Sequence, residues 1–282
     1  MIRVKIFSDF CGSKGAKEIY ERLCDAENLD FYGKGKQVWI TEDDDYTHAI
    51  IMNKAMPILK IPKKNVIGLA FEPFEILRIT NEFVEYAQQY IGKYFIGDKR
   101  GLPEPFIEHF GYMWYSNPKR DIVTKTKLMS IIVSEKHWAP GHAYRHTLIE
   151  KIIEANLPID IYGKGSMKYS HKSNNVKGEF NDAEPYENYM YSICIENFTS
   201  NHYFSEKIMS PLLHNCMPIY LGCKQIHEYF DDILILSGNT NDDIQLLVEI
   251  FKCAGLFYRK TYTEKNINTV SLLNNIHKIF DV

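Results

Sequence analysis

Short apolar runs alternate with amphipathic stretches along the first part of the chain. Strands buried in a parallel sheet have almost continuous apolar runs, whereas a surface helix repeats its apolar residues every three or four positions. Strand-type runs occur at residues 2–7, 38–41, 48–52, 66–70 and 94–97, and helical patterns at residues 15–23 and 81–89. This alternation predicts a parallel sheet with helices on both faces.

A mostly polar segment, SNPKRDIVTKTK at residues 116–127, separates this pattern from a second one like it. Further strand-type runs follow at residues 128–133, 159–162, 193–195, 217–221 and 233–236. Helical patterns follow at residues 143–155, near Tyr186, at 225–230 and 242–253, and in one long terminal helix from about Glu264. A chain of 282 residues is long enough for two domains of ordinary size. We therefore predict an α/β protein with two domains, residues 1–122 and 123–282.

The segment at residues 191–222, YSICIENFTSNHYFSEKIMSPLLHNCMPIYLG, predicts a buried strand, a polar loop, a helix and a second buried strand. Ser205 has the position of an N-cap, and Glu206 and Lys207 lie in the first turn of the helix. A lysine there opposes the helix dipole, whereas the free N–H groups at a helix start attract anions. A phosphate-bearing ligand would account for this lysine.

The composition restricts the classes of partner. With a net charge of −3, the chain has no basic excess for general binding to nucleic acid. No apolar run has the length of a membrane span, and the first residues, MIRVKIFSDF, have a strand pattern rather than that of a signal peptide. The 19 tyrosines and 16 phenylalanines suit an aromatic core as well as sugar-stacking surfaces. We expect a soluble cytoplasmic protein.

The cysteines and the acidic and histidine clusters do not predict a metal site. The six cysteines include no CxxC pair, and we expect all of them to be reduced. The acidic run at residues 42–45 resembles a DxD motif, but a polar turn between two strands is the expected interpretation. His142 and His146 have the spacing of ligands on one helix face, yet no third ligand stands near them. We expect a capping or surface role for His142.

The segment at residues 191–222 resembles the α1,3/4-fucosyltransferases of glycosyltransferase family 10. The shared pattern consists of Glu-Asn at 196–197, Ser-Glu-Lys at 205–207 and Met-Pro-Ile-Tyr-Leu-Gly at 217–222. Phe198 stands where the family usually has a small serine. The resemblance implies the GT-B fold, in which two Rossmann-like domains face one another across a cleft. The terminal helix of such chains often packs back on the first domain.

The same resemblance implies an inverting transfer of L-fucose from GDP-fucose to a hydroxyl of a glycan or oligosaccharide acceptor. The nucleotide sugar would bind the second domain and the acceptor the first, with no tightly bound cofactor and no metal. The sequence leaves open a donor such as UDP-xylose, and also a glycan-binding protein without catalysis. It does not predict the acceptor, the linkage or the oligomeric state.

The resemblance assigns the donor site residue by residue. Arg145 follows the strand in VSEKHWAPGHAYR, as the family's pyrophosphate-binding arginine follows a Val-Ser-Asn strand, and its planar fork suits phosphate oxygens. Lys207 is the first candidate for a cation that stabilises the leaving diphosphate, and Arg145 is the second. The resemblance places Asn197, Tyr203 and Glu206 at the donor nucleotide. Glu196 is expected to orient the loop.

The catalytic base is predicted in the first domain. In the segment NVIGLAFEPFEI, a predicted buried strand ends and two carboxylates, Glu72 and Glu75, follow it. Ligands of open α/β sheets bind at the carboxyl ends of the strands. Family members have a glutamate just after the corresponding strand, which favours Glu72. Glu75 is the alternative, and a third interpretation is that both carboxylates cap the following helix.

Overall fold

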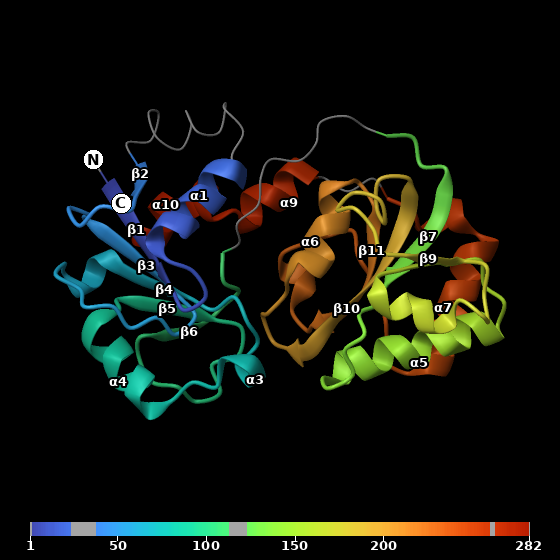
Figure 1. Cartoon of the computed structure of the whole chain (residues 1–282), viewed down its shortest axis with the longest axis horizontal. Helices are drawn as coiled ribbons and strands as arrows, with labels where there is room; N and C mark the ends of the chain where they lie inside the picture. Colours follow the sequence, from blue (N-terminus) through green and yellow to red (C-terminus); the bar gives the residue numbers. More distant parts are fainter. Residues whose placement is uncertain (1, 24–37, 113–122, 260–262, 282) are drawn as a thin grey trace. The chain divides into compact units, whose positions relative to one another are not determined.

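The computed structural model describes residues 2–23, 38–112, 123–259 and 263–281. By their contacts these residues form two compact units, each built around its own sheet (Figure 1). The first unit comprises Met1–Asn117, Ser200–Tyr203 and Ile267–Val282, and the second comprises Pro118–Thr199 and Phe204–Asn266. The sequence boundary proposed at residue 122 lies outside the described residues.

The first unit contains a six-stranded sheet in the order β2-β1-β3-β4-β5-β6, and each neighbouring pair is parallel. The strands are β1 (Ile2–Ser8), β2 (Val38–Thr41), β3 (His48–Met52), β4 (Val66–Leu69), β5 (Lys93–Ile96) and β6 (Phe106–Glu108). All five residues of β3 are buried, as the continuous apolar run predicts for a central strand.

Helices cover the first sheet. They are α1 (Ser13–Leu23), α3 (Phe74–Leu77), α4 (Asn81–Tyr90) and α10 (Leu272–Phe280), and a short 3-10 helix, η1 (Lys63–Asn65), precedes β4. Phe83 and Ala87 of α4 join the core of the sheet, and Thr80 caps this helix by accepting from the backbone N–H of Phe83. The helix α10 belongs to this unit, where the ring of Phe280 packs edge-on against His48 with 4.9 Å between centroids.

The second unit contains a six-stranded sheet in the order β12-β11-β10-β7-β8-β9. The strands are β7 (Lys127–Ile132), β8 (Asp160–Tyr162), β9 (Val176–Gly178), β10 (Tyr189–Ser200), β11 (Met217–Cys223) and β12 (Leu234–Ile235). The chain adds β8 and β9 on one side of β7 and then returns to add β10, β11 and β12 on the other side. The strand order therefore reverses between β7 and β10, and such a switch point is where open α/β sheets bind ligands.

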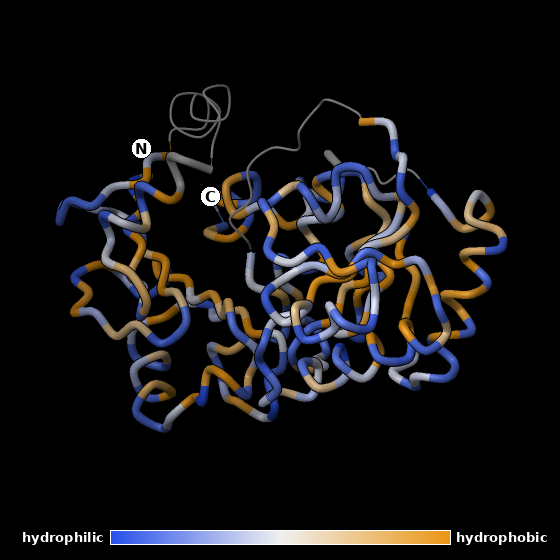
Figure 2. Tube along the Cα trace, turned by 45° about the vertical axis from the view of Figure 1, so that its right-hand side comes forward, coloured by the Kyte–Doolittle hydropathy of each residue, from blue (hydrophilic) through white to orange (hydrophobic). Residues whose placement is uncertain are grey.

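The helical elements of the second unit complete its core. They are α5 (Pro140–Glu154), η2 (Lys164–Tyr169), α6 (Glu206–Leu213), η3 (Ile226–Glu228), α7 (Thr240–Lys252) and α8 (Ala254–Phe257). The boundary between the units then falls within α9 (Thr263–Val270), whose residues from Ile267 onward belong to the first unit. Apolar side chains of α5 and α7, including Leu148 and Leu247, share one core with β7, β8, β10 and β11. Figure 2 shows hydrophobic stretches in the interior of each unit.

Three sequence predictions of secondary structure were wrong. The helix predicted near Tyr186 is a series of turns over residues 182–188, because Pro185 has no N–H for a helical hydrogen bond. The single long terminal helix is two helices, α9 and α10, since Ser271 stops the first and caps the second by accepting from the N–H of Asn274. The loop after residue 195 is shorter than predicted because β10 continues to Ser200.

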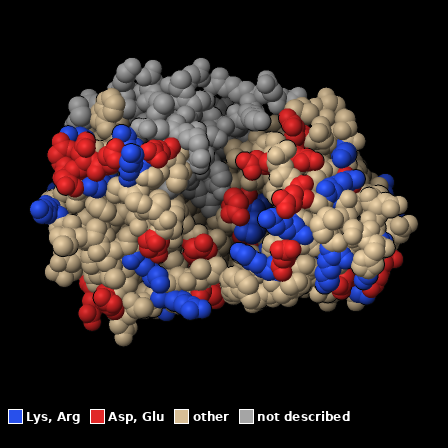
Figure 3. Space-filling model, in the orientation of Figure 1, with Lys and Arg blue, Asp and Glu red and all other residues tan. Residues whose placement is uncertain are grey.

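Acidic and basic side chains are interspersed on the face shown in Figure 3. Among the helices of the described residues, none combines the length and apolar character needed to cross a bilayer. Five cysteines lie in the described parts of the chain and are free thiols, and the sixth, Cys24, lies outside them.

Candidate functional site

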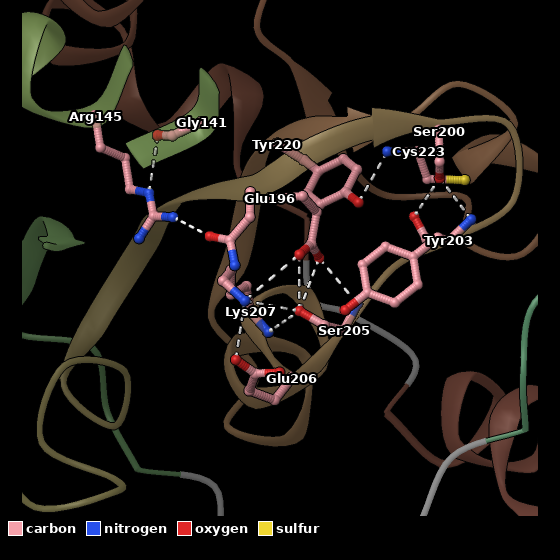
Figure 4. Close-up of polar contacts among 11 residues, drawn as sticks. Gly141, Arg145, Glu196, Ser200, Tyr203, Ser205, Glu206, Lys207, Tyr220 and Cys223 are labelled. Carbon is pink, nitrogen blue, oxygen red and sulfur yellow. Dashed lines mark hydrogen bonds and ion pairs between the residues drawn. The ribbon is translucent and has the colours of Figure 1, made fainter. Parts of the chain in front are cut away.

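The site stands at the switch point of the second sheet, where α5 follows β7 and where β10 ends. Arg145 of α5 donates from Nη2 to Oδ1 of Asn197 in β10 over 2.6 Å, and its Nε donates to the carbonyl oxygen of Gly141 over 3.2 Å (Figure 4). The residue is only 6% exposed. Burial lowers the pKa of Arg145, while the nearby carboxylate of Glu196 opposes this shift.

The most informative feature of the site is the Nη1 group of Arg145, which makes no hydrogen bond to the described residues. A guanidinium carries five N–H donors. Among the described residues, hydrogen bonds are made by Nε and Nη2, and Nη1 makes none. In Figure 4, one terminal nitrogen of the Arg145 guanidinium carries no dashed line. A buried cation with uncommitted donors is suited to an anionic ligand.

Gly141 allows α5 to approach β10 closely. A Cβ atom placed on this glycine would lie 1.8 Å from the carbonyl oxygen of Glu196. The helix begins with Pro140 at its first position, where a missing N–H is tolerated. The first turn of α5 therefore lies directly against the backbone that carries Asn197.

A buried carboxylate organises the start of α6. Glu196 is 2% exposed, and its Oε1 accepts from the backbone N–H of Ser205 at 2.8 Å. The hydroxyl of Ser205 also donates to Oε2 at 2.8 Å (Figure 4). Burial raises the pKa of Glu196, and the positive charge of Lys207 opposes this shift. These contacts agree with the predicted role of Glu196 in orienting the loop.

Ser205 caps α6, as predicted. Its Oγ accepts from the backbone N–H of Lys207 at 3.3 Å and from the Nζ of the same residue at 3.1 Å. The Nζ of Lys207 also lies 3.0 Å from Oε1 of Glu206 and 3.6 Å from Oε2 of Glu196. Burial would lower the pKa of Lys207, but these two carboxylates raise it above its ordinary value. Lys207 is therefore a charged residue that is held in place at a helix N-terminus.

The connection between β10 and α6 groups with the first unit. In this segment, Ser200–Tyr203, the backbone N–H of Asn201 donates to Oδ1 of Asp98 at 2.8 Å. The side-chain amide of Asn201 donates to Oε1 of Glu108 at 2.9 Å. Asp98 follows β5 and Glu108 is the last residue of β6, so two carboxylates at strand ends of the first sheet fix this segment.

Tyr203 lies at the end of this segment. Its backbone N–H donates to Oγ of Ser200 at 2.7 Å, and its side chain is 8% exposed. A Cβ on Gly97 would come within 2.7 Å of the Tyr203 nitrogen, so only glycine fits there. The structure thus fixes the backbone of Tyr203, and its contact with a nucleotide stays a prediction.

The two candidate bases lie in the first unit, after β4. Glu72 is partly exposed and immediately precedes Pro73, the N-cap of α3. Glu75 lies in the first turn of α3 and forms an ion pair with Arg100. Pro73 itself makes no side-chain hydrogen bond as the N-cap of α3. The interpretation that both carboxylates cap this helix stays a prediction.

Sequence reasoning missed the polar pair at the switch point of the first sheet, between β1 and β3. Asp9 follows β1 and Asn53 follows β3, and the amide of Asn53 donates to Oδ1 of Asp9 at 3.1 Å. The sequence could have indicated this pair, because Asn53 directly follows the apolar run at residues 48–52 and Asp9 stands two positions after the run at residues 2–7. Asn53 has a φ of 52°, which asparagine adopts more readily than most residues.

The acidic turn and the histidine pair form other contacts. In the run at residues 42–45, Asp44 pairs with Lys5 at 2.8 Å and Asp45 pairs with Arg3. His146 contacts the hydroxyl of Tyr169 and the carbonyl oxygen of Ser134 through its two ring nitrogens. Within the described ranges, no group of three or more His, Cys, Asp or Glu side chains is placed to hold a metal ion.

His142 is not a surface residue, which corrects that part of the sequence prediction. It is 3% exposed, and its Nδ1 accepts from the backbone N–H of Ala139 at 3.3 Å, so it has the predicted capping role. Burial, followed by the charge of Arg145, lowers the pKa of His142 to about 4. Its ring contacts Trp138, which is 62% exposed and which sequence reasoning did not single out.

The two parallel sheets with covering helices define an α/β protein of the GT-B class, and solved structures share this fold. An α1,3-fucosyltransferase with GDP-fucose is 14% identical, with a TM-score of 0.54 over 100% of this chain and 90% of the other. Alr3699/HepE of Anabaena with UDP-glucose is 10% identical, with a TM-score of 0.59 over 100% and 99%. A DNA-modifying β-glucosyltransferase is 11% identical, with a TM-score of 0.53 over 100% of both chains.

A family model matches a part of the chain that lies mostly in the second unit. Residues 122–233 match the family model of the C-terminal part of glycosyltransferase family 10 (fucosyltransferase). This is the family that the motif at residues 191–222 resembles. The matched part contains Arg145, Asn197, Glu206 and Lys207. A comparison with curated proteins finds no match.

Proposed function

We propose that the protein is an inverting glycosyltransferase that transfers L-fucose from GDP-fucose to a hydroxyl group of a glycan. The observation that carries this proposal is the Arg145 guanidinium, buried at the switch point of the second sheet with Nη1 uncommitted among the described residues. The family match supports the choice of a nucleotide sugar over other anions. The fold shared with nucleotide-sugar complexes is consistent with it.

Arg145 and Lys207 bind the diphosphate in this proposal. During transfer, the bond between the anomeric carbon and the diphosphate oxygen breaks, and its electron pair leaves with GDP. Fixed cations stabilise this developing charge without having to reorganise. Lys207 is suited to the role because Ser205, Glu196 and Glu206 already hold its Nζ. The first turn of α6 adds its free N–H groups.

The nucleoside end of the donor lies at the start of α6. The side chain of Glu206 is 64% exposed and can accept hydrogen bonds from ribose hydroxyls. Asn197 holds Arg145 in orientation through its side-chain oxygen, and its side-chain NH2 group donates to no other described residue. Tyr203 packs near the nucleotide.

The acceptor side of the reaction uses a carboxylate of the first unit. The acceptor oxygen attacks the anomeric carbon from the face opposite the diphosphate, so the configuration inverts. The proton of that hydroxyl passes to Glu72, which is the proposed general base. Glu75 is less suitable, because the charge of Arg100 already neutralises its carboxylate.

Calorimetric titration of the wild-type protein with GDP and UDP, followed by a transfer assay with GDP-fucose, tests the proposal. We expect GDP to bind more tightly than UDP and GDP-fucose to be consumed when a glycan acceptor is present. Preference for UDP, with turnover of a donor such as UDP-xylose or UDP-glucose, would replace the donor. Glycan binding without binding of either nucleotide would indicate a non-catalytic protein.

A further inference from the structure

An exposed tryptophan borders the proposed donor site. Trp138 precedes α5 and is 62% exposed, which is unusual for the largest aromatic side chain. Its ring is nonetheless supported on two sides. The centroid of the His142 ring lies 5.1 Å away at an interplanar angle of 73°, and that of Phe198 lies 5.9 Å away at 50°. Both distances and angles are typical of favourable aromatic pairs.

The supporting rings come from the two elements that hold Arg145. His142 lies one turn before Arg145 in α5, and Phe198 directly follows Asn197 in β10. The hydrogen bond between Arg145 and Asn197 therefore connects the same two elements as the Trp138 contacts. A largely exposed aromatic ring therefore packs on His142, one helical turn before a cation whose Nη1 makes no hydrogen bond among the described residues. Ligands that match both features carry an anionic group next to an apolar surface.

The direction of a nucleotide sugar in the site follows from the order of the charged groups. Glu206 and Lys207 lie at the start of α6, whereas Arg145 and Trp138 lie in and before α5. With the nucleoside at α6 and the diphosphate between the two cations, the transferred sugar extends toward α5. The C–H groups on one face of a sugar ring are apolar and can cover an aromatic ring.

We propose that Trp138, supported by His142 and Phe198, is a specificity-determining residue that stacks against the apolar face of the transferred sugar. This inference rests on the proposed function. The low pKa of His142 keeps the supporting ring neutral near pH 7, so that it adds no charge beside the sugar. A 6-deoxy sugar, which has a methyl group in place of a hydroxymethyl group, offers a larger apolar face than a hexose.

Titration with GDP and GDP-fucose, without acceptor, separates the sugar from the nucleotide. We expect Trp138→Ala to weaken GDP-fucose binding by about tenfold, because one aromatic contact contributes up to about 1.5 kcal/mol. GDP binding should change by less than about twofold in the same protein, since GDP lacks the sugar. Trp138→Phe should retain most of the affinity. Trp39→Ala is the matched control, because Trp39 is 40% exposed in β2 of the first unit.

Three outcomes would overturn the inference. Equal losses for GDP and GDP-fucose would place the base or ribose on Trp138, and no loss for either ligand would leave Trp138 outside the donor site. If the wild-type protein binds neither ligand, the proposed function itself fails, and this is seen before any variant is made. Circular dichroism and thermal unfolding of Trp138→Ala establish that the variant is folded when its affinity is measured.

Discussion

Arg145 and Asn197 are 52 positions apart in the sequence, and their side chains meet through a hydrogen bond of 2.6 Å. One residue comes from the helix after β7 and the other from β10, the two strands between which the order of the sheet reverses. The contact exists because both strands present their carboxyl ends at the same edge. Residues from distant parts of the chain therefore form one site.

Removal of either proposed diphosphate cation should weaken donor binding and slow transfer. Loss of one group aimed at developing charge costs about 3 kcal/mol in the barrier, or roughly a hundredfold in rate. We expect this for Arg145→Ala and for Lys207→Ala. Arg145→Lys should recover only part, because lysine lacks the planar fork. Lys151→Ala, which removes an exposed lysine of α5, is the control, and unchanged nucleotide affinity and turnover in both site variants would disprove the assignment.

Glu72→Gln should preserve nucleotide affinity while transfer falls by about a hundredfold or more. The amide keeps the size of the side chain but cannot accept the proton, and the proposed diphosphate contacts, Arg145 and Lys207, lie in the second unit. Steady-state rates are compared for Glu72→Gln, Glu75→Gln and Asp9→Asn, the last of which changes the carboxylate at the switch point of the first sheet. The variant that loses transfer identifies the base. Full activity in all three would place the base elsewhere.

Transfer should survive incubation with EDTA if Arg145 and Lys207 supply the charge that a metal ion provides in other transferases, as proposed. The assay is repeated after dialysis and with added Mg²⁺ or Mn²⁺. A complete loss in EDTA that Mg²⁺ or Mn²⁺ restores would contradict this expectation.

Gly141→Ala should destabilise the protein and reduce donor binding together. The added methyl group would lie 1.8 Å from the Glu196 carbonyl oxygen, so α5 must move away from β10. Overpacking of this kind costs about 1–3 kcal/mol. Urea unfolding measures the change, with Gly255→Ala as the control, because a Cβ on Gly255 would meet no atom within 4 Å. A Gly141→Ala protein of wild-type stability would show that the helix moves freely.

His142 should make the protein less stable in acid. Its pKa is about 4 in the folded protein, below the ordinary value of 6.5, so the unfolded chain binds more protons between these two values. Stability therefore rises with pH across this window and falls as the pH drops toward 4. Thermal unfolding of His142→Gln should show a smaller decrease, whereas His171→Gln, at an exposed position, should behave like the wild type. An NMR titration with a His142 pKa near 6.5 would contradict this account.

The apolar runs predicted most of both sheets, because central parallel strands are buried on two faces and leave an uninterrupted signal. The strand predicted at residues 48–52 is β3 with the same limits. The three-residue strands β6 and β9 were missed, since so few residues do not establish a pattern. The errors at Tyr186 and Ser271 came from single residues that interrupt a helical pattern.

The site was predicted only where local sequence determines it. Ser205 as the cap of α6 follows from residue type and spacing, and the structure confirms it. The exposure of Trp138 and the need for glycine at position 141 depend on how α5 packs against β10. A local sequence pattern does not predict this tertiary contact. The roles in donor binding and catalysis all stay predictions, namely those of Glu72, Arg145, Asn197, Tyr203, Glu206 and Lys207.

Asn201 donates hydrogen bonds to Asp98 and Glu108 of the first unit. For this reason the second unit is a poor candidate for expression on its own. A fragment of residues 123–266 would retain Arg145 and Lys207, yet the segment Ser200–Tyr203 would lose the surface against which it folds. That segment lies between Asn197 and Glu206, so its loosening would reach both sides of the donor site. The first unit could be exchanged between related enzymes in order to change acceptor preference. Such an exchange would have to keep Gly97, Asp98 and Glu108.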